Sequence, residues 1–361
     1  MTTAAMMNGK AVDPAKLEAF QQKMLDDLGG AMSTVIGFMG DKLGLYEKLS
    51  ANGGLTSIEL AERTGLCERN VREWLNGQAA AGWIEYDPGR EMFSMTSEQA
   101  AVLAQEGHPA FLQGFIDFIY SCFKDEEKLR ETFRSGRGLS WGDHHECLYC
   151  SADRFFRPLY EASLVQEWIP ALDGVKEKLE RGAKVADVGC GHGSSLIIMA
   201  QAFPNSQFFG FDIHEPSIEV AQAQAKEAGV DRRTTFQVCP AKEFPGDDYD
   251  FIAFFDCLHD MGDPVGAAKH VHSTLAPDGT WMVVEPFAND ELVDNLNPVG
   301  QLYYSASTMA CVPSSQAQEV GLALGAQAGE KRLTNVLKEG GFTRIRRAHA
   351  SPFNLVLEAR P

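Results

Sequence analysis

The segment that most constrains this chain is residues 185–193, which read Val-Ala-Asp-Val-Gly-Cys-Gly-His-Gly. An apolar run with an acid at Asp187 and three alternating glycines stands directly before a stretch of helical character that begins near Ser194. The glycines at 189, 191 and 193 have no Cβ, so the backbone can turn tightly and a ligand can approach the N-terminus of that helix. This order predicts an α/β fold with a nucleotide-type cofactor site.

The spacing of the glycines separates two classes of cofactor. A dinucleotide fingerprint reads G-x-G-x-x-G and is followed by an acid about 20 residues later, whereas Ser194 stands where its last glycine would be. Here the acid precedes the glycines, and the next predicted strand, residues 207–213, carries Asp212 near its end. This pattern resembles motif I of the class I S-adenosylmethionine (SAM) methyltransferases, and the resemblance implies that Asp212 binds the ribose hydroxyls.

Strand patterns recur through the C-terminal half, with helical stretches between them, as an alternating β/α sheet requires. We predict strands at 184–188, 207–213, 235–239, 249–255, 280–285, 343–349 and 353–359. Only residues 350–352 separate the last two strands, too few for a crossover helix, so these strands must pair antiparallel. The predicted fold is therefore a Rossmann-like, seven-stranded class I methyltransferase sheet with an antiparallel last strand.

The length of 361 residues favours more than one domain. We expect a flexible N-terminus at 1–14, a mostly α winged-helix and dimerisation domain at 15–105, an aromatic-rich helical connector at 106–178 and a SAM-binding catalytic domain at 179–361. A helix is expected to start at Asp13-Pro14, an N-cap followed by an N1 proline.

Residues 55–96 have the order of a winged helix: two short helices joined by a glycine turn, then a hairpin that turns at 87–89. The second helix carries Glu68, Arg69, Arg72 and Glu73, whose charges cancel, and ten acids against six bases between 41 and 100 give a net charge of −4. Such a surface repels phosphate. We therefore expect this domain to serve dimerisation or packing over the cofactor, and not DNA.

Net charge and composition exclude several classes of protein. A formal charge of −18 argues against nucleic acid as a partner, and no apolar run reaches the roughly 18 residues of a membrane span. The first ten residues lack the features of a signal peptide, and the eight scattered cysteines are typical of reduced thiols. A cytoplasmic protein is expected.

The aromatic segment 108–168 allows two interpretations: its rings fill a seam between domains and a subunit interface, or part of it roofs an apolar substrate pocket. Within it, His144, His145, Cys147 and Cys150 could be zinc ligands. Structural zinc sites normally join two ligand clusters separated by a longer loop, so we predict no metal here and leave this point open.

Residues 254–264 read Phe-Phe-Asp-Cys-Leu-His-Asp-Met-Gly-Asp-Pro. They resemble the L-H-D-W-x-D stretch of the winged-helix small-molecule O-methyltransferases, in which the histidine is the general base. The resemblance assigns that role to His259 and makes Glu285, at the end of the fifth strand, the acid that orients it. Methyl transfer requires alignment of donor and acceptor and removal of the acceptor's proton, and a histidine held by a carboxylate suits that task.

The chain also departs from that family. Met261 stands where those enzymes have a tryptophan beside the adenine, and Ala241-Lys242 stands where an acid usually follows strand three. Residues 302–313 are more similar to the uncharacterised bacterial winged-helix methyltransferases. In both groups this segment caps the acceptor, which makes Tyr303, Tyr304 and Met309 pocket candidates.

Together these observations predict a SAM-dependent methyltransferase that acts on a small-molecule acceptor and forms a homodimer. We expect the methyl group to go to a hydroxyl group of the acceptor, with a thiol or an amine as the other possibilities. Loss of the methyl group converts SAM to S-adenosylhomocysteine (SAH). The alternatives are a SAM- or metabolite-sensing winged-helix regulator and a nicotinamide-dependent oxidoreductase. The predicted cofactor residues are Asp187, Gly189, Cys190, Gly191, Asp212, Ile213, Ala241, Lys242, Phe255 and Asp256, and the predicted substrate residues are Phe115, Tyr149, Phe155, Tyr303, Tyr304 and Met309.

Overall fold

The computed structural model describes residues 6–7 and 10–361. The predicted flexible N-terminus therefore lies in part, at 1–5 and 8–9, outside the described residues. The chain divides into two compact units, Met1–Ile116 and Asp117–Pro361. No helix in the described part of the chain is both long and apolar enough to cross a membrane.

The first unit has the predicted winged-helix order. After the short strands β1 (Met6–Met7) and β2 (Lys10–Ala11) come a long helix, four short helices and a hairpin. These elements are α1 (Pro14–Lys42), α2 (Leu45–Ser50), α3 (Ser57–Thr64), α4 (Glu68–Ala80), β3 (Glu85–Asp87), β4 (Met92–Ser94) and α5 (Ser97–Leu103). Asp13 caps α1 by accepting hydrogen bonds from the amides of Ala15 and Lys16, so the predicted helix start is confirmed.

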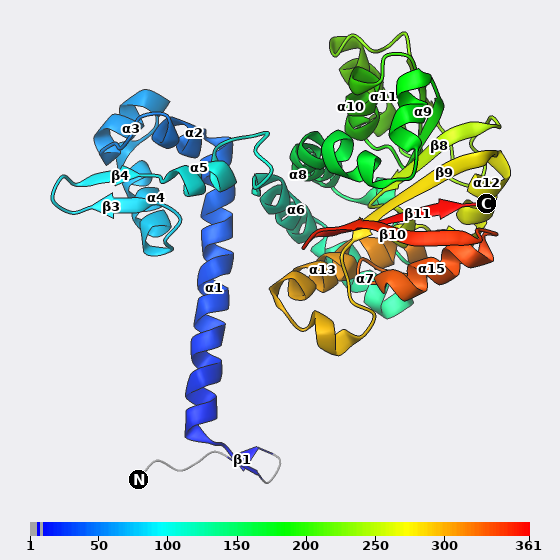
Figure 1. Ribbon diagram of the computed structural model, residues 1–361. Helices are drawn as coiled ribbons and strands as arrows, with labels where there is room; N and C mark the ends of the chain where they lie inside the picture. The colour runs from blue at the N-terminus through cyan, green and yellow to red at the C-terminus, as the bar shows by residue number, and fades with distance from the viewer. Residues whose placement is uncertain (1–5, 8–9) are drawn as a thin grey trace. The chain divides into compact units, whose positions relative to one another are not determined.

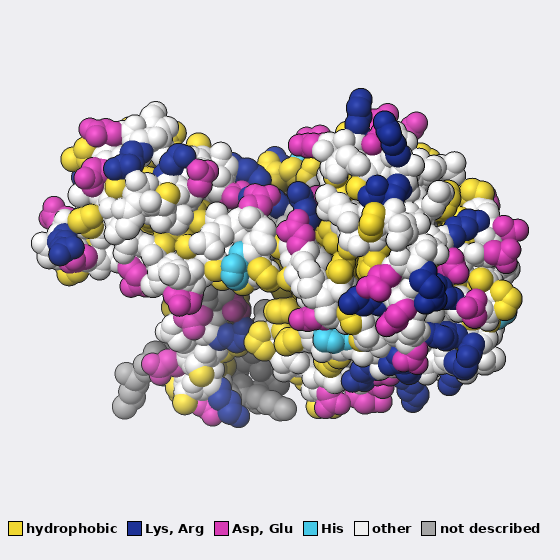
Figure 2. Space-filling model, turned by 45° about the horizontal axis from the view of Figure 1, so that its top comes forward, with side chains coloured by type: hydrophobic (Ala, Val, Ile, Leu, Met, Phe, Trp, Pro, Cys, Tyr) yellow, Lys and Arg dark blue, Asp and Glu magenta, His cyan; other side chains and the backbone are white. Residues whose placement is uncertain are grey.

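The charges on α4 are paired along the helix. Arg72 contacts Glu68 and Arg69 contacts Glu73, each pair one turn apart. On the face of this unit that Figure 2 shows, acidic and basic side chains are interspersed. The cancellation of charge expected from the sequence is thus present on the helix itself.

The two halves of α1 have different surroundings within the first unit. Its C-terminal half packs on α4, where the Trp74 indole donates a 2.7 Å hydrogen bond to the carbonyl of Ile36. Along its length α1 also exposes large apolar side chains at intervals of three or four residues, the period of one helix face. These are Leu17, Phe20, Met24, Leu25, Leu28, Met32, Val35 and Met39, here called the α1 stripe.

The segment predicted as a connector, 106–178, is helical, and the division between the two units falls within it, after Ile116. Its elements are α6 (Gln113–Lys124), α7 (Glu126–Ser135), the short helix η1 (Trp141–Asp143), α8 (Cys147–Ser163), η2 (Leu164–Trp168), η3 (Ile169–Ala171) and α9 (Val175–Arg181). Most of its rings are buried or half-buried, and Tyr160 and Trp168 join the core beneath the sheet.

A seven-stranded sheet forms the centre of the second unit (Figure 1). The strand order is β10-β11-β9-β8-β5-β6-β7, with β5 (Lys184–Val188), β6 (Gln207–Asp212), β7 (Thr234–Val238), β8 (Tyr249–Phe255), β9 (Leu275–Pro286), β10 (Arg344–Ala350) and β11 (Asn354–Arg360). Strands β5 to β9 pair parallel, whereas β11 pairs antiparallel with both β9 and β10. The predicted sheet with its antiparallel last strand is confirmed.

Helices cover both faces of this sheet. One core joins the sheet to α9, α10 (Ser194–Ala202) and α11 (Glu215–Glu227), and the other joins it to α12 (Pro264–Thr274) and α15 (Gly329–Glu339). Neighbouring β5 residues alternate between these cores, since Val185 lies in the first and Ala186 in the second. Parallel strands buried on both faces leave their carboxyl ends as the edge where loops form a ligand site.

The remaining elements follow β8 and β9 in the chain. They are η4 (Leu258–Asp260), η5 (Leu292–Asn295), α13 (Pro298–Met309) and α14 (Cys311–Gln316).

Candidate functional site

The glycine loop after β5 has the backbone that only glycine adopts without strain. Gly189, Gly191 and Gly193 all have φ between +50° and +80°. A Cβ on Gly189 would meet the Cys257 side chain, whereas a Cβ on Gly191 would meet no atom within 4 Å. The loop is therefore packed underneath at Gly189 and open above Gly191.

Asp212 fixes this loop from the end of β6. Its Oδ2 accepts a 2.9 Å hydrogen bond from the amide of Gly191, and its Oδ1 accepts one of 2.9 Å from the amide of His214. Burial raises the pKa of Asp212, and the hydrogen bonds from the His214 and Gly191 amides oppose that rise. The carboxyl is thus held in one orientation on the wall of the site.

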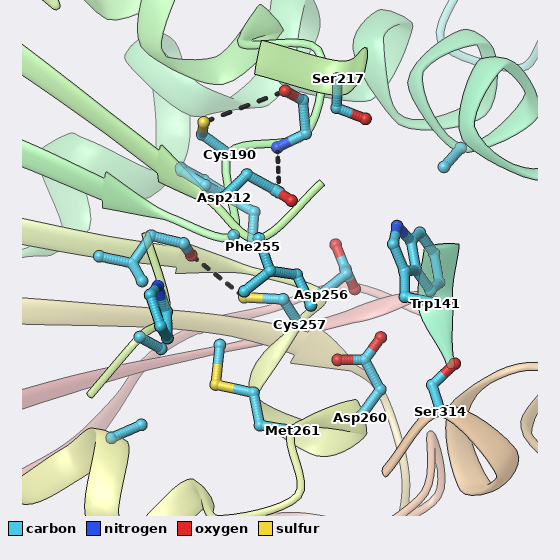
Figure 3. A pocket seen from close by; sticks show the side chains of 18 of the residues that line it. Trp141, Cys190, Asp212, Ser217, Phe255, Asp256, Cys257, Asp260, Met261 and Ser314 are labelled. Atoms are coloured by element: carbon cyan, nitrogen blue, oxygen red, sulfur yellow. Dashed lines mark hydrogen bonds between the residues drawn. The ribbon is translucent and has the colours of Figure 1, made fainter. Parts of the chain in front are cut away.

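The loop and Asp212 border a cavity of ≈ 270 Å³ at the carboxyl ends of the strands (Figure 3). Nine of the ten predicted cofactor residues line it: Gly189, Cys190, Gly191, Asp212, Ile213, Ala241, Lys242, Phe255 and Asp256. Met261, the residue in place of the family's tryptophan, lines it as well. The Lys242 ammonium ion-pairs with Asp263 at 3.1 Å and Glu319 at 2.8 Å.

The tenth predicted residue, Asp187, lies behind the cavity wall and is fully buried. Its Oδ2 accepts a 2.5 Å hydrogen bond from the Ser195 hydroxyl, and its Oδ1 has no partner among the described residues. Burial raises the pKa of Asp187 to about 7, against the Ser195 hydrogen bond. A buried acceptor without a partner is costly, which marks this carboxyl as a group that a ligand or water can satisfy.

His259 and Glu285 are in direct contact. His259 Nδ1 lies 2.5 Å from Glu285 Oε2, and Glu285 Oε1 accepts a 2.9 Å hydrogen bond from the Leu258 amide. Burial favours the neutral imidazole, but the Glu285 charge and Cys311 outweigh it and hold the pKa of His259 well above its usual value. The other ring nitrogen, Nε2, lies 3.2 Å from Cys311 Sγ. Neither His259 nor Glu285 belongs to the described lining of the cavity, which their neighbour Asp260 lines.

The segment that carries His259 is braced by α14 and the residues after it. The carbonyl of Asp260 accepts a hydrogen bond from the Gln318 amide nitrogen, the carbonyl of Met261 accepts one from Ser315, and the Gly325 amide donates to the carbonyl of His259. These contacts join residues more than 50 positions apart and fix the place of the imidazole relative to the cavity.

Two acidic side chains, Asp256 and Asp260, line the cavity beside His259. Burial and then the Glu285 charge raise the pKa of Asp256 well above its usual range, and burial raises the pKa of Asp260 to about 7 although His259 opposes it. Asp256 also has φ of +49°, a strained conformation for a residue other than glycine.

The predicted substrate residues have separate locations. Tyr149 lines the cavity and its ring lies 4.1 Å from that of His214, centroid to centroid, while Phe155 contacts the cavity residue Phe156 at 5.0 Å. Tyr303, Tyr304 and Met309 lie on α13 outside the cavity lining, and the Tyr303 hydroxyl donates to the carbonyl of Phe353. Phe115 belongs to the first unit and is half-buried there.

The His144 and Cys150 region has contacts of its own. His144 Nδ1 lies 3.2 Å from Asp125 Oδ2, and His145 Nδ1 accepts a hydrogen bond from the Cys147 amide. Among the residues that the structure describes, no three His, Cys, Asp or Glu side chains are grouped as metal ligands are.

Several residues of the site were not predicted from the sequence. Asp260 directly follows His259 and Asp263 comes four positions after it, so nearness to His259 in the sequence was the available signal. The others come from elements that only the fold brings to the cavity, and they are Trp141, Asp153, Ser314, Gln318 and Glu319, together with Cys311 behind it.

Each of two stretches of the chain matches a family model. Residues 179–341 match the family model described as "Methyltransferase domain", and residues 31–105 match the "Rv2258c-like winged HTH domain". Among curated proteins, the chain is 29% identical over 131 residues to the ubiquinone biosynthesis O-methyltransferase of Bordetella avium (strain 197N). This match covers 35% of the chain and 51% of that relative, so the chain spans about half the length of the curated relatives it matches.

Solved structures match nearly the whole chain. Mitomycin 7-O-methyltransferase superimposes with a TM-score of 0.71 at 21% identity, over 97% of this chain and 100% of that one. Human N-acetylserotonin methyltransferase, solved in complex with SAM, does so with a TM-score of 0.68 at 18% identity, over 98% and 99%. At these identities the structures show a shared fold.

Proposed function

We propose that this chain, which carries a class I methyltransferase domain behind a winged helix-turn-helix domain, transfers the methyl group of SAM to a small molecule. The observation that carries the proposal is the single cavity that the glycine loop, Asp212 and Asp260 share, with the His259 and Glu285 pair directly behind Asp260. We favour a hydroxyl as the group that accepts the methyl, with a thiol or an amine as the other candidates.

The residues present fit SAM as the cofactor. The open space above Gly191 suits its amino-acid part, the fixed Asp212 carboxyl suits two ribose hydroxyls, and Ala241 and Met261 offer an apolar surface for adenine. Asp187, behind the cavity wall, acts through the Ser195 hydroxyl, which lines the cavity. When bound, SAM supplies an electrophilic methyl group on a sulfonium.

His259 is the proposed general base. Glu285 holds Nδ1, which leaves Nε2 to take the acceptor's proton, and Cys311 Sγ now occupies the hydrogen-bonding position at Nε2. We propose that the acceptor's hydroxyl takes the place of this thiol. The braced backbone of η4 aligns the imidazole and removes the need for reorganisation during the reaction.

This role predicts a pH dependence. A general base acts in its neutral form, so kcat/KM should rise with pH as His259 loses its proton, with a midpoint above 6.5 because Glu285 and Cys311 raise the pKa of His259 against the effect of burial. Glu285→Gln removes the charge and should move the midpoint downward. A pH profile that is flat between about pH 6 and 9 in the wild type would exclude His259 as the titrating base.

Binding measurements separate this function from a nicotinamide-dependent oxidoreductase. Calorimetry should show saturable binding of SAM and SAH and no binding of NAD, because the glycine loop lacks the dinucleotide spacing and Ser194 stands where its last glycine would be. Binding of NAD in preference to SAH would contradict the proposal.

The partner we propose is a second copy of the chain, held by the α1 stripe. Eight large apolar side chains on one helix exceed what a monomer commonly leaves exposed, and a self-complementary stripe on a 29-residue helix suits a two-fold contact.

We expect the double variant Phe20→Glu with Leu28→Glu to halve the mass measured by light scattering after gel filtration, because two buried charges per protomer oppose the contact. Ala19→Glu, on the opposite face of α1, is the matched control and should leave the dimer intact. A wild type that is monomeric at micromolar concentration, or a double variant that remains dimeric, would exclude the α1 stripe as the interface.

A further inference from the structure

One side of the cavity holds more buried acidic groups than the chain itself neutralises. Asp256, at the end of β8, and Asp260, in η4, both line the cavity. Within the described part of the chain, the strongest electrostatic influences on them come from Glu285, from Asp212 and from His259, and of these only His259 can carry a positive charge. His259 is already in contact with Glu285.

Unpartnered polar atoms lie beside these carboxyls. Asp256 Oδ1 accepts a 3.3 Å hydrogen bond from Asn354, and the Tyr160 hydroxyl acts on the same carboxyl and opposes the rise of its pKa. Asp256 Oδ2 has no well-oriented hydrogen bond of its own among the described residues. Ser314, on α14, is 1% exposed and lines the cavity, and its hydroxyl also lacks a partner in the described part of the chain. Buried polar atoms are normally satisfied, so atoms left open on one cavity wall indicate a polar ligand group.

An aromatic ring completes this side. Trp141, from η1, lines the cavity, and Figure 3 shows it on the same side as Asp256, Asp260 and Ser314. Carboxylates with an indole face are the groups that proteins use to bind ammonium ions, through charge-assisted hydrogen bonds and cation–π contact. A hydroxyl such as that of Ser314 can accept a further N–H.

Resting on the proposed function, we infer that Asp256, Asp260, Ser314 and Trp141 bind a protonated amine on the methyl acceptor. The charge balance favours the acceptor over the cofactor. The cofactor can supply one unpaired cation, its sulfonium, because the amino group of SAM brings its own carboxylate. A second buried carboxyl then takes either a proton or a cation from the other ligand, and the open polar atoms of Asp256 and Ser314 beside Trp141 favour the cation. The acceptor is then a small molecule that carries both an ammonium group and the group that is methylated.

Calorimetry on the full chain saturated with SAH tests this inference with three phenols that differ in charge. Tyramine carries an ammonium group, 4-ethylphenol is neutral and 4-hydroxyphenylacetate is an anion. At pH 8 tyramine should bind at least about tenfold more tightly than either of the others, the size expected of one charge-assisted hydrogen bond in a buried site. A wild type that binds tyramine no more tightly than 4-ethylphenol overturns the inference.

Two variants test which carboxyl causes the preference for tyramine. Asp260→Asn should bring the preference for tyramine to within about twofold, and Asp256→Asn should reduce it while keeping the fold, because asparagine tolerates the positive φ at this position. Asp231→Asn, an exposed acid outside the cavity lining, is the matched control and should keep the full preference. If Asp260→Asn weakens SAH and leaves the preference unchanged, the carboxyl serves the cofactor and the inference is wrong.

The pH adds a second readout. Asp260 is flanked by His259 and Glu285 and faces Asp212 and Asp256, and burial raises the pKa of Asp260 to about 7. Only the ionised carboxyl attracts an ammonium group, so the affinity for tyramine should increase from about pH 6 to 8 while that for 4-ethylphenol stays constant. An affinity for tyramine that does not change with pH contradicts the inference. Loss of SAH binding by the wild type would instead contradict the proposed function, so the two failures are distinguishable.

Discussion

Replacing His259 with alanine should lower the rate of methyl transfer by about 100-fold or more, the scale of a lost general base, and leave SAH affinity within about twofold of the wild type. The second expectation follows from the geometry, because His259 lies behind Asp260 and outside the described lining of the cavity. Steady-state kinetics together with calorimetry on the same preparation measures both quantities.

His349→Ala is the matched control for this prediction. His349, on β10, also faces a carboxylate, that of Glu167 on η2, at 3.8 Å, but neither residue lines the cavity. The control should keep wild-type activity. An unaffected rate in His259→Ala would show that alignment alone drives the reaction, as for an acceptor that needs no deprotonation.

Glu285 extends the same argument. It holds Nδ1 of His259 and the Leu258 amide at once, so Glu285→Gln should lose much of the activity that His259→Ala loses. The two substitutions act on one unit, and their combination should cost little more than His259→Ala alone. Additive losses would mean that Glu285 has a role of its own.

Replacing Asp212 should abolish most of the affinity for SAM without loss of the fold. A carboxylate that accepts two ribose hydroxyls contributes about 1.5–3 kcal/mol for each hydrogen bond, so Asp212→Ala should weaken SAM and SAH by on the order of 100-fold or more. Calorimetry gives the affinity. Unchanged affinity would exclude this placement of the ribose.

Thermal unfolding without ligand separates lost binding from lost structure. Burial raises the folded-state pKa of Asp212 above its unfolded value, so near neutral pH the buried carboxylate opposes folding. Asp212→Asn should therefore melt at or above the wild-type temperature. A large fall in the melting temperature would assign to Asp212 a structural role through Gly191 and His214.

The sequence predicted best what is local and periodic. The predicted strands at 184–188 and 249–255 coincide with β5 and β8, because buried parallel strands are continuous apolar runs with clear ends. The start of β9 was less clear, since its first residues read as a turn and pair with β8 at Leu275 before the register shifts. The cofactor side of the cavity follows from the same logic, as each of its residues stands in the last positions of a predicted strand or shortly after it.

The rest of the cavity depends on contacts between distant segments. Ser314, Gln318 and Cys311 reach the site because α14 packs against η4, a contact that no local pattern encodes. The aromatic residues of α13 show the opposite limit. The resemblance made Tyr303 and Tyr304 pocket candidates, but the sequence does not show which surface these side chains meet. In the structure the Tyr303 hydroxyl donates to the Phe353 carbonyl, outside the cavity lining.

The central claim is tested most directly by incubating the protein with methyl-labelled SAM and a fractionated metabolite extract, beside the His259→Ala variant, and following the label by mass spectrometry. The account predicts label on a hydroxyl of a small molecule that also carries an amine, and loss of that signal in the variant. If the protein binds SAM tightly but transfers no label to a compound in any fraction, the account is contradicted and a SAM-sensing regulator is favoured.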